Sequence, residues 1–253
     1  MRIAVLFGGI SPERNVSIAG GKSVVNALKT LNHTVLPIDP AFGANGLRTE
    51  DELSSPEKYP TLDELAQYHT KNLIDCINSE LFDNIDIAFL VLHGVNGEDG
   101  KIQALLELRG IPYTGSKIKA SAVSIDKIAS KVMFSAAGIP TPPWITIHDY
   151  EAGNFDIYKE VRDELGEHIV VKPNEQGSTI GITIVNSGNL DDIHSAVEEA
   201  LKYSKTVCVE KFIEGRELTV GILGKEALPV IEIIAEDGFY DYKHKYSKGH
   251  TEY

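Results

Sequence analysis

IVVKPNEQGSTIGITIV, at residues 169–185, is the stretch around which the other predictions are organised. It begins with a β-branched run and ends with isoleucines at alternate positions, which is the pattern of a half-buried strand. Those isoleucines are Ile180, Ile182 and Ile184. The pattern predicts a strand, a loop and a second strand.

The loop between these strands combines glycines with hydroxyl side chains. Gly177 and Gly181 flank Ser178 and Thr179, and Lys172 adds a cation at the end of the first strand. Glycine lets the backbone approach a ligand closely, and successive N–H groups with hydroxyls suit phosphate oxygens. No GxxxxGK[ST] motif is present. We therefore expect a flexible flap over a nucleotide rather than a Walker A loop, with an ordinary glycine-rich hairpin as the alternative.

Length and composition restrict the class of protein. The 253 residues are 42% apolar, which supports a folded core in one large or two medium domains. The formal net charge of −13 argues against nucleic acid as a partner. No apolar run reaches the roughly 18 residues of a membrane span, and the N-terminus has the pattern of a strand, not of a signal peptide. Cys76 and Cys208 form no CxxC pattern and are expected to be buried free thiols, so we expect a cytoplasmic protein without membrane association.

The N-terminal part of the chain carries a βαβ pattern. We predict strands at 2–7 and 33–39, with a helix between them that begins near Ser17, a good N-cap residue. A near-continuous apolar run at 85–92 predicts a central parallel strand. Glu13 follows the first strand, at the crevice where open α/β sheets bind ligands. The alternative role for Glu13 is that of a solvated acid at the start of a helix.

His93 follows the apolar run and precedes a loop rich in glycine. This position at the tip of a buried strand is well placed for a ligand, although a single histidine is more often a hydrogen-bonded structural residue. Helices are predicted at 101–108 and 124–137. Lys127 and Lys131 lie one turn apart on the second of these helices and therefore share a face.

The second half of the chain continues with alternating strands and helices. Strands are predicted at 144–148 and 206–213, and helices at 154–166 and after Asn189, which would cap its helix. The end of the later strand, EKFI, offers an acceptor, a cation and apolar surface, as an adenine would require. Its residues are Glu210, Lys211, Phe212 and Ile213. The alternative is an ordinary strand end.

The last part of the chain has the pattern of a hairpin followed by a cover loop. Alternation from Glu217 to Ile222 and an apolar run at 228–235 predict its strands. Residues 238–253 are aromatic, basic and punctuated by glycine, which favours a mobile cover loop over a core element.

Taken together, these motifs resemble the D-alanine–D-alanine ligases of the ATP-grasp family. The match runs in family order over essentially the whole chain. The matching pieces are residues 7–17 (FGGISPERNVS), His93-Gly94 with 97–100 (GEDG), 112–116 (PYTGS), Asp126-Lys127, 171–173 (VKP) with 177–181 (GSTIG), 210–213 (EKFI), and 239–242 (FYDY) with Lys245-Tyr246.

The resemblance implies an ATP-dependent ligation of two D-alanines through an acyl phosphate, for peptidoglycan precursor synthesis. It implies that Glu13 binds the ammonium group of the first D-alanine, with Val16 and His93 in the same subsite. Ser178 and Tyr246 would be linked to Glu13 by hydrogen bonds and would complete the catalytic set. Closure of the flap and cover loop would keep water from the acyl phosphate.

The resemblance also implies an ATP site. Lysines would hold the phosphates together with the glycine loop, because phosphoryl transfer depends on positioning and on neutralising oxygens. The implied phosphate residues are Lys127, Lys172, Gly177, Ser178, Thr179 and Lys245. The implied adenine and ribose residues are Glu210, Lys211, Phe212, Ile213, Phe239 and Glu217.

The implied architecture is α/β and has three parts. They are a Rossmann-like, substrate-binding N-terminal domain at 1–115, a central α+β nucleotide-binding subdomain at 116–210, and the start of a third subdomain at 211–253. The family continues past the cover loop into strands that carry its Mg²⁺ ligands, so we expect no metal ligands in this chain and a truncated third subdomain. We also expect weak or no catalysis by the chain alone, and an exposed apolar face on the sheet begun by residues 213–235.

The expected partners are ATP, D-alanine and a second copy of the chain in a homodimer. One alternative is a related ligase with another D-amino acid or a D-hydroxy acid as acceptor, although Tyr246 favours an amine by resemblance. A second alternative is a catalytically impaired nucleotide-binding fragment. A dinucleotide oxidoreductase is a third, disfavoured because GxGxxG is missing from the first βα turn.

Overall fold

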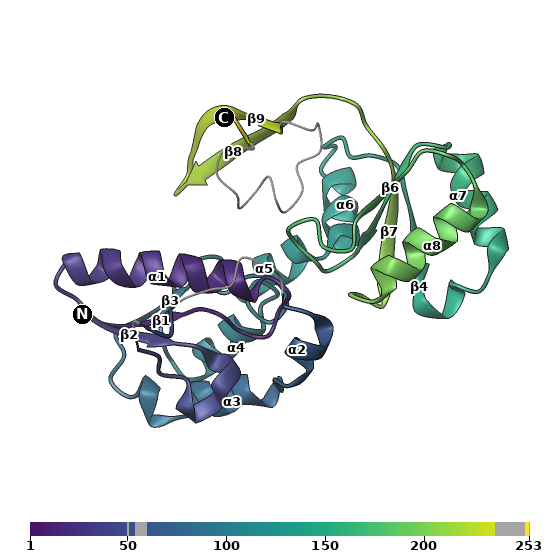
Figure 1. The fold of residues 1–253 in the computed structure, drawn as a ribbon. Coiled ribbons are helices and arrows are strands. Elements are labelled where there is room, and N and C mark those ends of the chain that lie inside the picture. Colours follow the sequence, from purple (N-terminus) through teal and green to yellow (C-terminus); the bar gives the residue numbers. More distant parts are fainter. Residues whose placement is uncertain (50, 54–59, 236–250, 253) are drawn as a thin grey trace. The chain divides into compact units, whose positions relative to one another are not determined.

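The computed structural model describes residues 1–49, 51–53, 60–235 and 251–252. It divides into two compact units, Met1–Ala137 and Gly138–Tyr253, and each is described by itself (Figure 1). Both units combine helices and strands, which confirms the predicted α/β class. The three-part division with boundaries at 115 and 210 stays a prediction.

The first unit is built on a parallel sheet with the strand order β2–β1–β3. The strands are β1 (Arg2–Leu6), β2 (Thr34–Ile38) and β3 (Ile87–Leu90). β1 pairs in parallel with both neighbours, as the βαβ pattern predicts. The prediction of a central parallel strand at 85–92 is confirmed with shorter bounds, because β3 pairs in parallel with β1 and its Ala88 forms a parallel bridge with Tyr113 on the other side. β3 ends at Leu90. The chain turns after β3 toward Gly94, whose φ of +68° no strand can accommodate.

The helices of the first unit are α1 (Arg14–Thr30), α2 (Leu62–Ala66), α3 (Lys71–Ile77), α4 (Lys101–Leu108), α5 (Ile118–Ile125) and α6 (Lys127–Ala136), with 3₁₀ turns η1 (Pro40–Asn45) and η2 (Glu80–Phe82). The helix predicted from about Ser17 is confirmed as α1, but it begins at Arg14, so the prediction of Ser17 as its N-cap was wrong. The Ser17 hydroxyl is bonded to other segments of the chain instead. The helix predicted at 124–137 is divided at Asp126, whose extended backbone and side-chain bond to the Ala129 N–H start α6.

The core of the first unit lies on both faces of the sheet, because side chains alternate along β1. Ala4 and Leu6 pack against α3 and α4, whereas Val5 and Phe7 pack against α1. Figure 1 shows α1 above the sheet and α3 and α4 below it. This sandwich fixes the carboxyl ends of β1 and β3, where the chain leaves the sheet.

The second unit contains an antiparallel sheet with the order β4–β7–β5–β6. Its strands are β4 (Trp144–His148), β5 (Ile169–Pro173), β6 (Thr183–Val185) and β7 (Thr206–Lys211), and its helices are η3 (Asp149–Glu151), α7 (Phe155–Leu165) and α8 (Leu190–Leu201). α7 and α8 pack on one face of the sheet. The predicted strand, loop and strand at 169–185 is confirmed. The second strand is shorter than predicted, because left-handed φ values of +48° at Ser178 and +62° at Thr179 keep Ile180 in a turn.

The remaining strands form an antiparallel sheet with the order β10–β9–β8. They are β8 (Glu217–Leu223), β9 (Glu226–Ala235) and β10 (Thr251–Glu252). The expected exposed apolar surface is present here, since Leu218, Ile222 and Val230 are 53%, 67% and 62% exposed. None of the helices in the described part of the chain is long and apolar enough to span a membrane.

Candidate active site

The first group of candidate site residues lies where β1 ends and α1 begins. Arg14 anchors the loop between them: its guanidinium donates to the Gly9 carbonyl at 2.6 Å and pairs with Asp39 at 2.5 Å. The Gly8 N–H donates to the Ser17 hydroxyl at 2.8 Å, and the Gly9 N–H donates to Asp39 at 3.1 Å. A buried ion pair with these extra bonds holds the loop in one conformation.

Ser11 joins this loop to the end of β3. Its hydroxyl donates to the His93 carbonyl at 2.7 Å and accepts the Glu13 N–H at 3.2 Å, and the residue is 2% exposed. Gly94 packs directly on Glu13, because a Cβ built at Gly94 would lie 2.9 Å from the Glu13 Oε2. The structure therefore brings Glu13 and His93 together, and Val16 lies in the first turn of α1 beside them.

Glu98 holds the loop that follows His93. Its Oε2 accepts the Gly94 N–H at 2.7 Å, and its Oε1 lies 3.9 Å from the His93 Nδ1. Neither Ser11 nor Glu98 was predicted as a site residue. Both residues lie inside the motifs at 7–17 and 97–100. These two motifs follow strands of one parallel sheet, so the sequence could have indicated that their residues meet at the same edge of the sheet.

In the second unit, Lys172 and Glu210 form an ion pair across β5 and β7. The register pairs Lys172 with Cys208, so Glu210 lies two residues further along β7 on the same face. Their side chains are 18% and 14% exposed. Lys211 is the next residue of β7, and alternation places its side chain on the opposite face. The structure therefore brings Lys172 and Glu210 together and does not bring Lys211 to them.

The glycine loop follows directly after Lys172 and Pro173. Its two ends are fixed on the segment between α8 and β7: Gln176 donates to the Tyr203 carbonyl at 3.2 Å, and a Cβ at Gly181 would lie 2.7 Å from the Tyr203 ring. Ser178 and Thr179 both adopt left-handed backbone conformations. Such conformations cost about 1–3 kcal/mol per residue and cluster at ligand clamps and switch regions. The loop therefore presents two strained residues with hydroxyl groups between firmly held ends.

An aromatic stack lies at the other end of β5 and β7. The rings of Phe212 and His168 are stacked with centroids 4.0 Å apart and an interplanar angle of 13°, and the Phe212 N–H donates to the His168 carbonyl at 3.0 Å. Ile213, beside this stack in the sequence, is 59% exposed. His168 was not predicted, because it precedes the apolar strand and belongs to no motif. Stacked rings beside an apolar side chain offer the surface that a purine base prefers.

The other predicted residues are placed as follows. Lys127 is the first residue of α6 in the first unit, and Glu217 is the first residue of β8 in the second. Phe239, Lys245 and Tyr246 lie outside the described residues. Across residues 1–49, 51–53, 60–235 and 251–252, no group of three or more His, Cys, Asp or Glu side chains could hold a metal ion.

Models of known protein families match most of this sequence. The model described as "D-ala D-ala ligase N-terminus" matches residues 2–116, and the model described as "D-ala D-ala ligase C-terminus" matches residues 133–253.

Individual relatives align over the whole chain. A D-alanine–D-alanine ligase of Magnetococcus marinus is 39% identical over 260 residues, which cover 100% of this chain and 70% of that relative. A D-alanine–D-alanine ligase of Desulforudis audaxviator is 40% identical over 252 residues, which cover 98% and 70%.

Solved structures of related ligases also resemble this chain. The D-alanine–D-alanine ligase from Bacillus anthracis has a TM-score of 0.71 and 36% identity, with 100% of this chain and 70% of that chain covered. The VanG D-Ala:D-Ser ligase from Enterococcus faecalis has a TM-score of 0.72 and 28% identity, with 99% and 75% covered.

Proposed function

This chain belongs to the D-alanine–D-alanine ligase family, and on that premise we propose which of its residues bind the substrates. The family uses ATP to join two D-alanines into D-alanyl-D-alanine for peptidoglycan. Its structures have the ATP-grasp fold, so the predicted ATP-grasp architecture is confirmed. The proposal concerns the roles of individual side chains.

Glu13 binds the ammonium group of the first D-alanine, and His93 and Val16 complete the subsite. The observation that carries this assignment is the Ser11 bridge, which holds the Glu13 loop and the His93 carbonyl together. Glu13 is 3% exposed. A carboxylate at that depth is stabilised by a cation with hydrogen-bond donors, which a substrate ammonium supplies.

ATP binds in the second unit along the ends of β5 and β7. Lys172 and the loop residues Gly177, Ser178 and Thr179 bind phosphate oxygens, with the Glu210 ion pair orienting the lysine. Phe212 and Ile213 contact the adenine, and His168 supports the Phe212 ring. We also propose that Lys127 binds the phosphates, Lys211 the base and Glu217 the ribose. The roles predicted for Phe239, Lys245 and Tyr246 remain part of the proposal.

The proposed reaction, which is that of the family, has two chemical steps. A carboxylate oxygen of the first D-alanine attacks the terminal phosphorus of ATP, and ADP leaves. The amine nitrogen of the second D-alanine then attacks the acyl carbon, the carbon–oxygen bond to phosphate breaks, and the amine releases a proton. Lys172 and the loop N–H groups stabilise the phosphate oxygens during both steps.

Magnesium is typical of the family. The described residues do not supply a set of ligands for it, and neither step above is assigned to a metal.

We also propose that the chain acts as a homodimer in the cytoplasm. The buried free thiols of Cys76 and Cys208 support a reducing compartment. A different acceptor is a second candidate, favoured by the likeness to the VanG D-Ala:D-Ser ligase.

The test of the proposed function is ADP release from ATP with D-alanine, D-serine, D-lactate or L-alanine as the added substrate. Because the sequence leads us to expect weak catalysis by this chain alone, we expect a low rate of release that depends on D-alanine and is abolished in Glu13→Gln. Release that responds to D-serine or D-lactate and not to D-alanine alone would change the assigned acceptor. Equal release by Glu13→Gln would remove Glu13 from the subsite.

A further inference from the structure

A pocket of about 370 Å³ in the first unit is lined by residues from the end of β3, the loop after His93, α4 and α5. We call it the β3–α5 pocket, and its lining includes Leu92, Glu98, Gln103 and Thr114. Small-molecule sites have volumes of roughly 300–1,000 Å³, so this pocket is large enough for a compact ligand. None of the substrate sites proposed above includes it.

Gln103 brings an unsatisfied hydrogen-bond acceptor to this pocket. Its Nε2 donates to the Gly97 carbonyl at 2.9 Å, and the residue is 4% exposed. The Gly97 carbonyl can only accept, so the side-chain amide must present its NH₂ group to it and direct Oε1 elsewhere. Among the described residues, this Oε1 has no hydrogen-bond partner. A buried acceptor without a partner is destabilising, and a ligand with an N–H donor would remove that cost.

The floor of the β3–α5 pocket is uncharged. Ser121 and Leu92 line it beside Gln103, and both are largely buried. The Thr114 hydroxyl oxygen accepts the Leu90 N–H at 3.0 Å, so its hydrogen remains for a bond to an acceptor. An N–H for Gln103 and an oxygen for Thr114 are the two groups of a primary amide. A charged group would be poorly solvated at this depth, so the floor favours a neutral end group.

The mouth of the pocket carries a negative charge. Glu98 is the only charged side chain among the described residues that line the pocket, and this side chain is 47% exposed. Its Oε2 accepts the Gly94 N–H at 2.7 Å, and both carboxylate oxygens have further lone pairs for an ammonium group. The mouth therefore favours a cation and repels carboxylates and phosphates.

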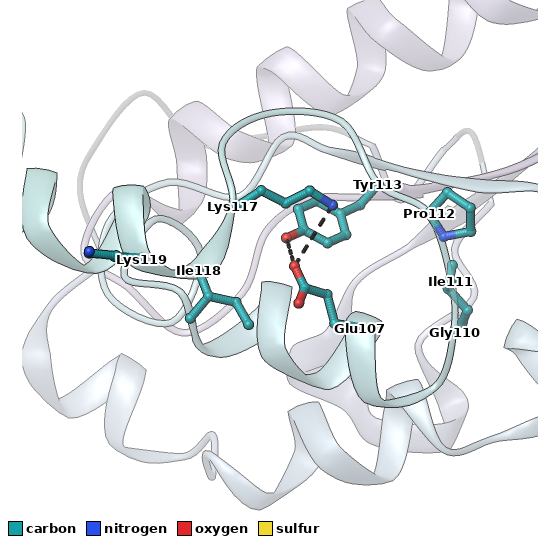
Figure 2. Close-up of a pocket in the computed structure, with 8 residues that line it drawn as sticks. All are labelled: Glu107, Gly110, Ile111, Pro112, Tyr113, Lys117, Ile118 and Lys119. Atoms are coloured by element: carbon teal, nitrogen blue, oxygen red, sulfur yellow. Dashed lines mark hydrogen bonds and ion pairs between the residues drawn. The ribbon is translucent and has the colours of Figure 1, made fainter.

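A larger pocket of the same unit, of about 600 Å³, shows the contrast. Figure 2 shows that its carboxylate, Glu107, is already engaged: the Tyr113 hydroxyl donates to it at 2.5 Å, and the Lys117 ammonium lies 3.8 Å from the same oxygen. The Lys117 ammonium also lies 4.7 Å from the centre of the Tyr113 ring. A ligand ammonium would have to displace Lys117, so Glu107 provides a control for Glu98.

We propose that the β3–α5 pocket binds a short aliphatic amine that carries a primary amide at its other end. The ammonium group pairs with Glu98 at the mouth. The amide N–H donates to the Gln103 Oε1, and the amide oxygen accepts the Thr114 hydroxyl. The carbon chain between the two ends packs on Leu92 and Ile125. This site is additional to those proposed for ATP and D-alanine.

An occupant of this pocket would also affect the D-alanine subsite, and this consequence rests on the proposed function. Glu98 fixes the Gly94 N–H, and Gly94 packs on Glu13. A ligand ammonium competes with that N–H for the Glu98 carboxylate, so we expect D-alanine to bind at least about 5-fold more weakly when the pocket is filled. Because such coupling is reciprocal, D-alanine should weaken binding of the amine by the same factor.

Calorimetric titration of 4-aminobutanamide into the whole chain tests the site. Two comparison ligands have the same ammonium end and carbon chain. 4-Aminobutanoate would place a carboxylate at the floor, and 1-aminobutane has no donor there. We expect one 4-aminobutanamide per chain, and binding of both comparison ligands that is at least about 10-fold weaker.

Neutral and charge-removing variants locate the bound ligand. Gln103→Met removes the acceptor at the floor without a change of charge. Ser124→Phe fills the pocket from an exposed position on α5, and it keeps the test valid if Gln103→Met fails to fold. Glu98→Gln removes the charge at the mouth. Glu107→Gln is its matched control, because the Glu107 side chain is 40% exposed and lines the other pocket.

We expect binding of 4-aminobutanamide to weaken at least about 10-fold in Gln103→Met, Ser124→Phe and Glu98→Gln, and to stay unchanged in Glu107→Gln and Glu13→Gln. Equal binding by the wild type, Gln103→Met and Ser124→Phe overturns the site, because the ligand then binds the acidic surface without specificity. Loss of binding in Glu13→Gln alone places the ligand in the proposed D-alanine subsite and also overturns the separate pocket. D-alanine affinity that saturating 4-aminobutanamide leaves unchanged overturns the coupling, whereas the ADP-release assay tests the ligase assignment independently.

Discussion

Replacing Gly94 by alanine gives the most specific test of the D-alanine half-site. Gly94 has a φ of +68°, and an added Cβ would lie 2.9 Å from the Glu13 Oε2 and 3.1 Å from the Ser11 Cβ. The first effect is backbone strain, which costs about 1–2 kcal/mol for an L-residue in the left-handed region. The second is displacement of the Glu13 carboxylate, because the methyl group and the oxygen cannot keep their positions.

The size of the second effect follows from the bond that Glu13 is proposed to make. A hydrogen bond to a charged group contributes about 1.5–3 kcal/mol, so its loss weakens D-alanine binding roughly 10- to 100-fold. Gly110→Ala is the matched control, since Gly110 has a φ of +72° and no atom within 4 Å of the added Cβ. Both variants therefore carry the same strain, and only Gly94→Ala crowds Glu13.

The assay is D-alanine binding by calorimetry, with urea denaturation of each variant measured alongside. We expect a similar loss of stability in both variants and weaker D-alanine binding in Gly94→Ala alone. If Gly94→Ala binds D-alanine as tightly as Gly110→Ala does, the Glu13 carboxylate is not the group that holds the substrate.

Two further predictions concern stability. Lys172→Met removes the Lys172 ammonium from a Glu210 side chain that is 14% exposed, so we expect a loss of about 2–3 kcal/mol by urea denaturation because a largely buried ion pair is broken. Lys202→Met, in an exposed ion pair, should show no measurable loss, and equal midpoints for the two variants would contradict this. Burial raises the pKa of Tyr158 to about 12 from its ordinary value of 10, so the stability it contributes is complete below pH 10 and is lost as the pH rises toward 12. Denaturation at a series of alkaline pH values should therefore show a shallower loss for Tyr158→Phe than for the wild type, and parallel curves would contradict the assignment.

Local patterns in the sequence predict the elements that depend on local interactions. α4 begins and ends at the predicted residues, since its apolar spacing and the glycine after it are both local signals. Asn154 and Asn189 cap α7 and α8 through side-chain bonds to the N–H two residues further on. β4 agrees with its predicted range for a similar reason, because its apolar and β-branched residues follow a proline-rich connection.

Features that depend on distant residues were not predictable in this way. Ser17 has the residue type of an N-cap, but its hydroxyl is bonded to the Gly8 N–H and the Val91 carbonyl, and the second bond spans 74 residues. The Ser11 bond to His93 spans 82 residues. The motifs that contain Ser11 and His93 indicate that both segments are functional, but they do not indicate which atoms of the two segments form a bond. The ion pair of Lys172 with Glu210 likewise depends on the register of β5 and β7, which neither strand specifies alone.

In the proposed ATP site, the glycine loop and Lys172 before it hold the phosphates of ATP. Calorimetric titration of ATP into the wild type, Lys172→Met and Lys202→Met tests it most directly, because binding requires no turnover. We expect one ATP per chain, affinity reduced at least about 10-fold in Lys172→Met through the lost charge-assisted bond, and unchanged affinity in Lys202→Met. A wild type that binds no ATP, or that binds it no more tightly than Lys172→Met does, would remove Lys172 and the glycine loop from the ATP site.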